Sequence, residues 1–370
     1  MISIENITAI KSVATGGSCH DVAMRTVTES HEKDNSALSD LFHHYLTGVL
    51  LTLLSEKDED CAAEVVHALF RRQHHEKFIP GLHKLGLAQE SHAVACAKYH
   101  YLSNHLGGVS VAFVAESEKK AWVRYLPPRW IFDGTALASV PTKVARAMLH
   151  GWHGHNGVSL GNRRLGFVCT GQTMDGFPGL EGYYIEEDYE LDPDQRLRFR
   201  FGEQCPPIDY GSLPQLSSEE WPRERKAKAS RKYSMEYIRN LLPVLSEVLG
   251  PLQAQGILYR AGRRIGMQFS AETQKTLGTN DPIKMLASLF SAQGDRITIV
   301  GTRIQQDGWR LVAGLEEECV PEWMDGLAGL WEGLIAVADS RRRLVLGDRM
   351  DLGDNSFTWD LRHVAEPKTF

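Results

Sequence analysis

The sequence predicts an α+β protein made of two similar halves, each built of helices and β-hairpins. The first observation is an amphipathic helix at residues 326–338 that leads into a β-hairpin at residues 342–363. The second is a comparable unit, in which an amphipathic helix that ends near Gly151 is followed by a hairpin at residues 163–190. The third is a pair of earlier hairpins, at residues 107–128 and 293–315, whose sequences resemble each other.

Short sequence matches support an internal duplication. Arg163-Arg164-Leu165 resembles Arg342-Arg343-Leu344, and Asp175 and Asp354 then follow at the same spacing. The two early hairpins each close on a tryptophan, which is Trp122 in one and Trp309 in the other. A pattern repeated at this distance indicates the architecture of the whole chain. The alternative is two unrelated α+β domains that share the same order of elements.

The chain has 370 residues, which is typical of two or three domains. We expect an N-terminal arm at 1–35 and a first α+β domain at 36–202. A linker rich in proline, serine and charge follows at 203–231, and the second α+β domain occupies 232–370.

The first domain is expected to contain helices at 36–54, at 60–75 with a stop or kink at Pro80, at 86–106 and at 141–155. The second is expected to contain a helix at 233–250 that stops at Gly250-Pro251, a helix that follows it, and a third helix at 282–293. Gly262 and Gly266 lie one turn apart in the middle one of these helices. Glycine disfavours a helix interior by roughly 1 kcal/mol relative to alanine, so we expect another backbone or a ligand to approach there.

Composition argues against several partners and compartments. The net charge is −6, and the one basic cluster lies at residues 223–232, so we expect no nucleic acid partner. The longest apolar run, at residues 47–54, is too short to span a bilayer, and no signal peptide is evident, so we expect no membrane. The six cysteines form neither a C-x-x-C pair nor a disulfide pattern. We therefore predict a cytoplasmic protein with reduced thiols.

Histidine is unevenly distributed, because all 15 histidines except His363 precede residue 156. Two of them, His100 and His105, lie on the helix at 86–106 and are candidates for a general base. His150 and His153 are spaced i, i+3 near a helix end and could share a metal, although a third ligand would be needed. Solvated or hydrogen-bonded histidines at a helix terminus are the commoner interpretation.

The strand after this helix combines carboxylates with tyrosines. Alternation places Glu181 and Tyr183 on one face and Tyr184 on the other. A carboxylate beside a tyrosine could act as acid, base or substrate anchor, whereas a solvated edge strand is the simpler interpretation. Arg124 is a candidate anchor for a substrate carboxylate because its guanidinium is a planar fork. Cys169 is a candidate nucleophile, but an isolated cysteine in a strand is usually part of the core.

The C-terminal half resembles a known family through three stretches. These are ILYRAGRRIG, the glycine-rich helix GLAGLWEGLIAVA and the closing hairpin with LGDNSFTW. They are similar to the 4-vinyl-reductase-type small-molecule-binding domain and to the L-2-amino-thiazoline-4-carboxylic acid hydrolase-like proteins. The family's closing cysteine is absent, because Met350 and Ser356 stand near the places where cysteines would fall. The resemblance implies an α+β fold in which an antiparallel sheet and a helix layer enclose a pocket for a small molecule. Two such tandem halves imply an arrangement like a fused homodimer.

We expect an enzyme that acts on a small organic molecule by acid/base chemistry of the hydrolase or lyase type. Its catalytic candidates are His100, His105, Glu181, Tyr183 and Tyr184, with Arg124 as the substrate-binding residue. The alternatives are a non-catalytic small-molecule carrier and a structural partner of a larger complex. No cofactor is evident, a divalent metal at His150 and His153 is left open, and so is a homodimer.

Overall fold

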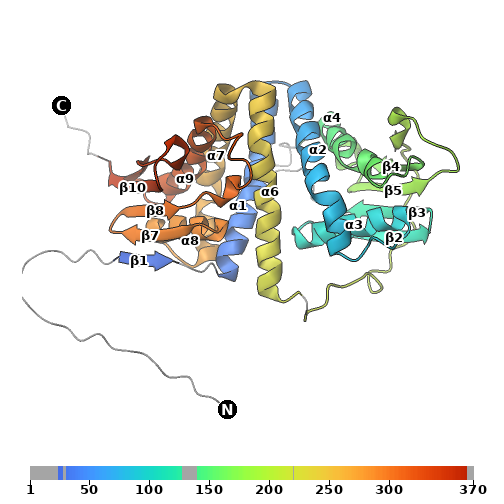
Figure 1. Ribbon diagram of the computed structural model, residues 1–370, viewed down its shortest axis with the longest axis horizontal. Coiled ribbons are helices and arrows are strands. Elements are labelled where there is room, and N and C mark those ends of the chain that lie inside the picture. The colour runs from blue at the N-terminus through green and yellow to red at the C-terminus, as the bar shows by residue number, and fades with distance from the viewer. Residues whose placement is uncertain (1–23, 28–30, 127–139, 220, 365–370) are drawn as a thin grey trace, which may run out of the picture.

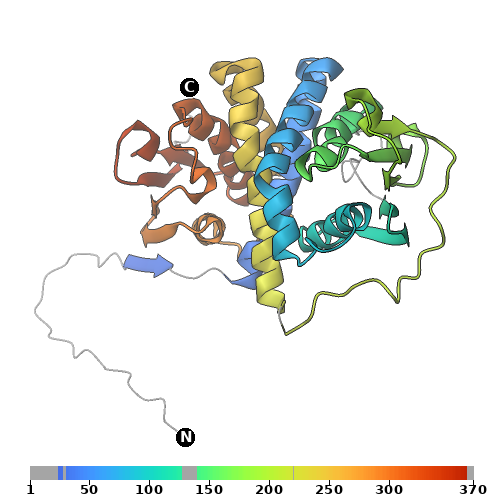
Figure 2. The ribbon, with the colours of Figure 1, turned by 45° about the vertical axis from the view of Figure 1, so that its right-hand side comes forward.

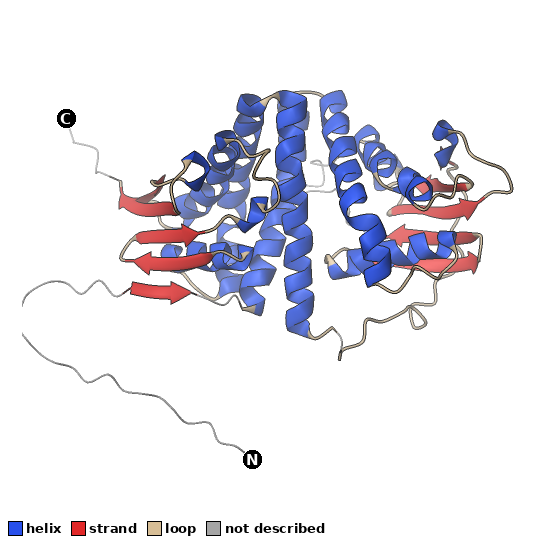
Figure 3. Ribbon diagram, in the orientation of Figure 1, coloured by secondary structure: helices blue, strands red, loops and turns tan. Residues whose placement is uncertain are grey.

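The computed structural model describes residues 24–27, 31–126, 140–219 and 221–364. Two sheets lie at opposite ends of a central group of helices (Figures 1 and 3). This arrangement of separate sheets and helices confirms the predicted α+β class. The predicted N-terminal arm and the connection after Leu126 fall largely outside the described residues.

In the first half, long helices come before the sheet. The elements in chain order are α1 (Glu32–Glu56), α2 (Glu59–Lys84), α3 (His92–Leu106), β2 (Val111–Ser117), β3 (Lys120–Tyr125), α4 (Thr142–Gly151), η1 (His153–His155), α5 (Asn156–Ser159), β4 (Leu165–Gly171), η2 (Thr173–Asp175), β5 (Leu180–Glu186), η3 (Pro193–Arg196) and β6 (Leu197–Phe199). The strands form a sheet in the order β2-β3-β5-β4-β6, in which only the β4–β6 pair is parallel.

The second half runs through helices and hairpins in a similar order. Its elements are α6 (Arg223–Leu249), α7 (Pro251–Leu277), α8 (Pro282–Gln293), β7 (Arg296–Val300), β8 (Arg303–Asp307), η4 (Arg310–Val312), α9 (Pro321–Ala338), β9 (Arg342–Leu346), η5 (Met350–Leu352) and β10 (Phe357–His363). Its sheet has the order β1-β7-β8-β10-β9, with β1 (Met24–Val27) antiparallel to β7. The order β7-β8-β10-β9 therefore repeats the order β2-β3-β5-β4 of the first sheet.

The first helix of each half packs against the other half. Helix α1 lies along α6 and α7, and the Tyr45 hydroxyl donates to the Leu258 carbonyl at 3.0 Å. Helix α6 in turn lies along α2 as well as α1, at the centre of the molecule (Figure 2). The two halves therefore share one continuous apolar core. The stretch 203–231, expected to be a linker, becomes helical at Arg223, where a Glu224–Lys228 pair one turn apart supports the first turns of α6.

Several predicted element ends agree with the structure. Helix α8 spans Pro282–Gln293 as expected, and Gly250 separates α6 from α7. In the last hairpin, Gly353 adopts a φ of 104° after η5, and the return strand begins at Phe357. Pro80 neither ends nor splits α2, because the helix continues to Lys84 with Leu82 buried beyond the proline.

The two glycines of α7 lie where α9 crosses it. A Cβ on Gly262 would lie 2.7 Å from the backbone nitrogen of Leu330, and a Cβ on Gly266 would lie 2.3 Å from its carbonyl oxygen. This confirms the prediction that another backbone approaches these positions.

Helix α1 is long and apolar enough to cross a membrane when only its length and composition are considered. However, 67% of its most apolar window is buried inside the protein. A core helix passes the same test, so α1 is weak evidence for a membrane span.

Candidate functional site

Five buried polar side chains meet where the first sheet faces its helices. They are His100 of α3, Tyr125 of β3, His153 of η1, Asn156 of α5 and Tyr184 of β5, and each is at most 3% exposed. Alternation along the strands turns Tyr125 and Tyr184 toward the helices, whereas Arg124 and Tyr183 point to the other face. Burial of so many polar groups is favourable only when they are hydrogen-bonded to one another.

One phenol joins two of the imidazoles. The Tyr125 hydroxyl lies 2.9 Å from His100 Nδ1 and 3.1 Å from His153 Nε2. The two imidazole rings are stacked, with centroids 4.1 Å apart and planes inclined by 10°. Because a hydroxyl carries one proton, it donates to one imidazole and accepts from the other. Tyr125 therefore couples the protonation states of two buried histidines.

Asn156 fixes the direction of these hydrogen bonds. Its Nδ2 donates to the Tyr184 hydroxyl at 3.0 Å and faces His100 Nε2 at 3.5 Å. An amide nitrogen only donates, so His100 Nε2 is the acceptor and the ring proton is on Nδ1. His100 then donates to Tyr125, and Tyr125 donates to His153 Nε2. The result is a directed chain of hydrogen bonds from Asn156 to His153.

A small cavity adjoins this network. It has a volume of about 30 Å³, enough for about one water molecule. His100, Tyr125 and His153 line it on the side of the first half. Tyr233 and Tyr237 of α6 line it on the other side, and the Tyr233 hydroxyl donates to Asn104 Oδ1 at 3.1 Å. The cavity is therefore completed by a helix of the second half.

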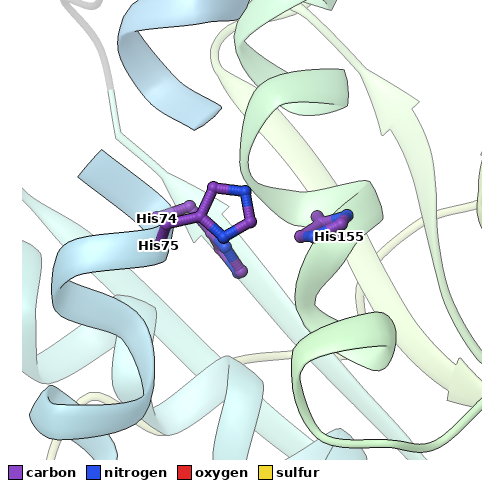
Figure 4. Close-up of side chains that lie close together, drawn as sticks. All are labelled: His74, His75 and His155. Carbon is purple, nitrogen blue, oxygen red and sulfur yellow. The ribbon is translucent and has the colours of Figure 1, made fainter. Parts of the chain in front are cut away.

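A second histidine cluster lies at the edge of the network. His74 and His75 of α2 face His155 of η1, and one potential ligand atom from each lies within 4.8 Å of the others (Figure 4). His74 Nε2 is 3.1 Å from Asn156 Oδ1, and since this oxygen only accepts, the proton of His74 is on Nε2. His74 Nδ1 is buried and has no hydrogen-bond partner.

Arg71 is the cation closest to this cluster. Its Nη1 contacts His155 Nδ1, while Nε and Nη2 donate to the carbonyls of Gly151 and His150 at 3.0 and 2.8 Å. Burial, followed by the charge of His155 and Arg71, lowers the pKa of His74 to about 3. Burial and then Arg71 lower the pKa of His155 to about 4. Both imidazoles are therefore neutral at neutral pH.

The expected catalytic residues lie in three different places, which are the buried network, the exposed end of α3 and the far face of the sheet. His100 and Tyr184 lie in the buried network, and burial raises the pKa of Tyr184 well above its usual value. His105 is exposed in the last turn of α3. Glu181 and Tyr183 lie on the far face of the sheet, so they do not join the histidines.

The far face of the sheet has its own ion pair. Arg124 and Glu181 are direct neighbours across β3 and β5 and form a salt bridge. Tyr183 packs on Trp122 and donates to Glu203 Oε2 at 2.8 Å. A cleft of about 410 Å³ adjoins Arg124 and Glu181. Since Glu181 neutralises Arg124, this arginine is a weaker carboxylate anchor than the sequence indicated.

His150 and His153 have different surroundings. His150 is exposed, whereas His153 is buried against Tyr125. Within the described residues, the group of potential metal ligands contains neither of them. Cys169 is buried, and burial raises the pKa of its thiol to about 12, so it is protonated at neutral pH and is a poor nucleophile.

Sequence reasoning missed Tyr125, Asn156, His74 and His155 as members of these two clusters. The HGWHGH stretch at residues 150–155 supplies one histidine to each cluster, because His153 lies in the buried network and His155 in the second cluster. Its partners on α2 and β3 come from distant parts of the chain, so no local spacing could identify them.

Comparisons of the chain with protein-family models, curated proteins and solved structures found no match. The resemblance of the C-terminal half to the 4-vinyl-reductase-type domain therefore stays a prediction. Function has to be argued from the geometry of the site.

Proposed function

We propose that the protein is an enzyme that acts on a small organic molecule by acid/base chemistry of the hydrolase or lyase type. The observation that carries the proposal is the Tyr125 hydroxyl held between two stacked, buried imidazoles at the wall of a cavity. Imidazole is the side chain best suited to exchange protons near neutral pH. In the assigned direction a proton passes from His100 Nδ1 through Tyr125 to His153 Nε2, so Tyr125 resupplies His153 after it gives a proton to a substrate, and His100 must then be reprotonated.

The cavity volume distinguishes this proposal from the carrier alternative. Pockets that hold a whole organic ligand usually have about 300–1,000 Å³ and a largely apolar lining. The cavity beside His100 and His153 has only about 30 Å³, although apolar side chains such as Phe70 and Met148 share its lining with the imidazoles. It suits a water molecule or the reacting group of a substrate. We place the rest of the substrate toward α6, where Tyr233 and Tyr237 must shift to admit it.

We further propose that the two halves are tandem copies, of which the first carries the chemistry. The repeated order of helices and hairpins and the shared strand order support this view. An experimental structure in which the two halves fail to superpose would contradict it. We also propose a reducing compartment such as the cytoplasm, because the five described cysteines are unpaired.

The proposal is tested with variants that change one function of the network at a time. Tyr125→Phe removes the bridging hydroxyl and keeps the ring, while His100→Gln and His153→Gln replace the imidazoles by neutral side chains. His105→Gln is the matched control, because it makes the same change on the exposed side of α3. Thermal unfolding and circular dichroism establish that each variant is folded.

Activity is measured by mass spectrometry of a cell metabolite extract incubated with each protein. We expect the wild type and His105→Gln to consume the same compound. The other three variants should consume it at least about 100-fold more slowly, which is the usual contribution of a general acid or base. Undiminished turnover in His100→Gln and His153→Gln would refute the assignment. A compound that binds the wild type tightly without being converted would favour the carrier.

A further inference from the structure

The second histidine cluster has the chemistry of a metal site. His74, His75 and His155 bring three imidazoles together at the surface end of the buried network (Figure 4). Their ring centroids are 5.1–5.9 Å apart, and their planes are inclined to one another by 74–81°. Rings that bind one ion converge on it from different directions, so their planes are not expected to stack. This arrangement differs from the parallel pair of His100 and His153.

We propose that His74, His75 and His155 form a binding site for a divalent transition metal such as Zn²⁺, with at least one further coordination position open to solvent. Neutral imidazoles suit Zn²⁺, Co²⁺, Ni²⁺ and Cu²⁺, and three protein ligands with an open position are typical of catalytic zinc sites. The inference does not depend on the proposed acid/base function, because metal binding is measured without a substrate.

The strongest evidence is the state of His74. Its Nε2 is hydrogen-bonded to Asn156 Oδ1, which places the lone pair on Nδ1. That nitrogen is buried and unpartnered, in a side chain only 1% exposed. A metal-bound histidine almost always donates its other ring N–H to an oxygen acceptor, which fixes the tautomer and the orientation of the ring. Asn156 Oδ1 is the oxygen acceptor that fixes the tautomer and the orientation of His74.

The distances require a small adjustment of the ligands. The potential ligand atoms lie within 4.8 Å of one another. Tetrahedral coordination at a Zn–N distance of 2.0–2.1 Å would bring neighbouring nitrogens to about 3.3 Å. His75 is exposed and His155 is partly exposed, so both can turn toward the ion. His74 is fixed by the core and defines the position of the metal.

Arg71 opposes metal binding in this arrangement. It holds the Nδ1 lone pair of His155, so a metal has to compete with the guanidinium for that imidazole. Its positive charge also repels a cation. Arg71 keeps two hydrogen bonds to the carbonyls of His150 and Gly151 when it releases His155. The site therefore has a built-in competitor, and removing it should increase the metal affinity.

The test uses the full chain, treated with chelator, dialysed and titrated with Zn²⁺ by calorimetry and with Co²⁺ by visible absorption. We expect one equivalent of metal per chain and the visible bands of tetrahedral Co²⁺. His75→Ala is the primary variant, because the side chain is exposed and its loss leaves the core intact. We expect His75→Ala and His155→Gln to weaken Zn²⁺ binding at least 10-fold, and Arg71→Gln to strengthen it.

His150→Gln is the matched control, because His150 is an exposed neighbour outside the cluster. Its affinity should equal that of the wild type. The proposal is overturned if the wild type binds no stoichiometric metal, or if His75→Ala and His155→Gln both bind Zn²⁺ as tightly as the wild type. Circular dichroism of each variant separates loss of a ligand from loss of the fold.

Discussion

Replacing Gly266 by alanine tests one of the close contacts between helices α7 and α9. The added Cβ would lie 2.3 Å from the carbonyl oxygen of Leu330 and 2.8 Å from the backbone nitrogen of Leu334. Both neighbours are backbone atoms of α9, so the two helices have to move apart. Forcing an extra carbon into a packed interface costs typically 1–3 kcal/mol, while alanine is favoured over glycine in a helix by roughly 1 kcal/mol. We expect Gly266→Ala to destabilise the protein by up to about 2 kcal/mol.

Gly256→Ala provides the control in the same helix. There the added Cβ would meet the Nη1 of Arg260 at 2.9 Å, and a flexible side chain can move away. Only the helix preference is left, so Gly256→Ala should be unchanged or up to about 1 kcal/mol more stable. Urea unfolding followed by far-UV circular dichroism measures both free energies. A Gly266→Ala variant as stable as the wild type would refute the close-approach argument.

Two further predictions concern buried titratable groups. Burial raises the pKa of Asp295 from 3.8 to about 6, so between these values the folded state holds a proton that the unfolded chain has lost. The contribution of Asp295 to stability should therefore fall by up to about 3 kcal/mol as the pH rises through this window, and Asp295→Asn should reduce the slope by that contribution in urea unfolding at a series of pH values. An unchanged slope would contradict the assignment to Asp295. Cys169 should react with iodoacetamide only on unfolding, because its thiol is buried and has a pKa of about 12. Labelling followed by mass spectrometry checks this, and rapid modification of Cys169 in the folded protein would refute it.

The fold was largely predictable from local patterns because they record which residues face the core. The bounds predicted for α8 agree with the structure to the residue, and the Gly250-Pro251 pair separated α6 from α7. The pairing of α1 with the second half was not predictable, because an apolar stripe indicates burial and does not name the partner. The first turns of α6 are polar enough to resemble a linker, although their charged pairs stabilise a helix.

The candidate site was predictable only in part. Strand alternation correctly placed Tyr184 on the opposite face from Glu181 and Tyr183. The histidine content correctly directed attention to the first half. However, the composite site proposed from the sequence combined residues from both faces of one sheet. Tyr125 and Asn156 resemble ordinary core and turn residues in the sequence. Their importance comes from the distant side chains that they connect.

The second half offers an internal comparison for the proposed site. In the first half, Tyr184 of β5 faces His100 and His153 between the sheet and its helices. In the second half, Trp359 of β10 packs on Phe290 of α8, which in turn packs on Trp331 of α9. Tyr184 pairs across to Ala121 of β3 as Trp359 pairs across to Ile304 of β8.

Elements in the same order therefore enclose aromatic rings in one half and imidazoles in the other. The rings of the second half bury mainly apolar surface, and the indole N–H of Trp359 donates to Gln306 Oε1 at 2.9 Å, whereas a buried imidazole has two nitrogens that each need a partner. The fold alone does not require histidines between the sheet and its helices, because the second half fills the corresponding space with aromatic rings. This difference favours a chemical role for the histidines of the first half over a structural one.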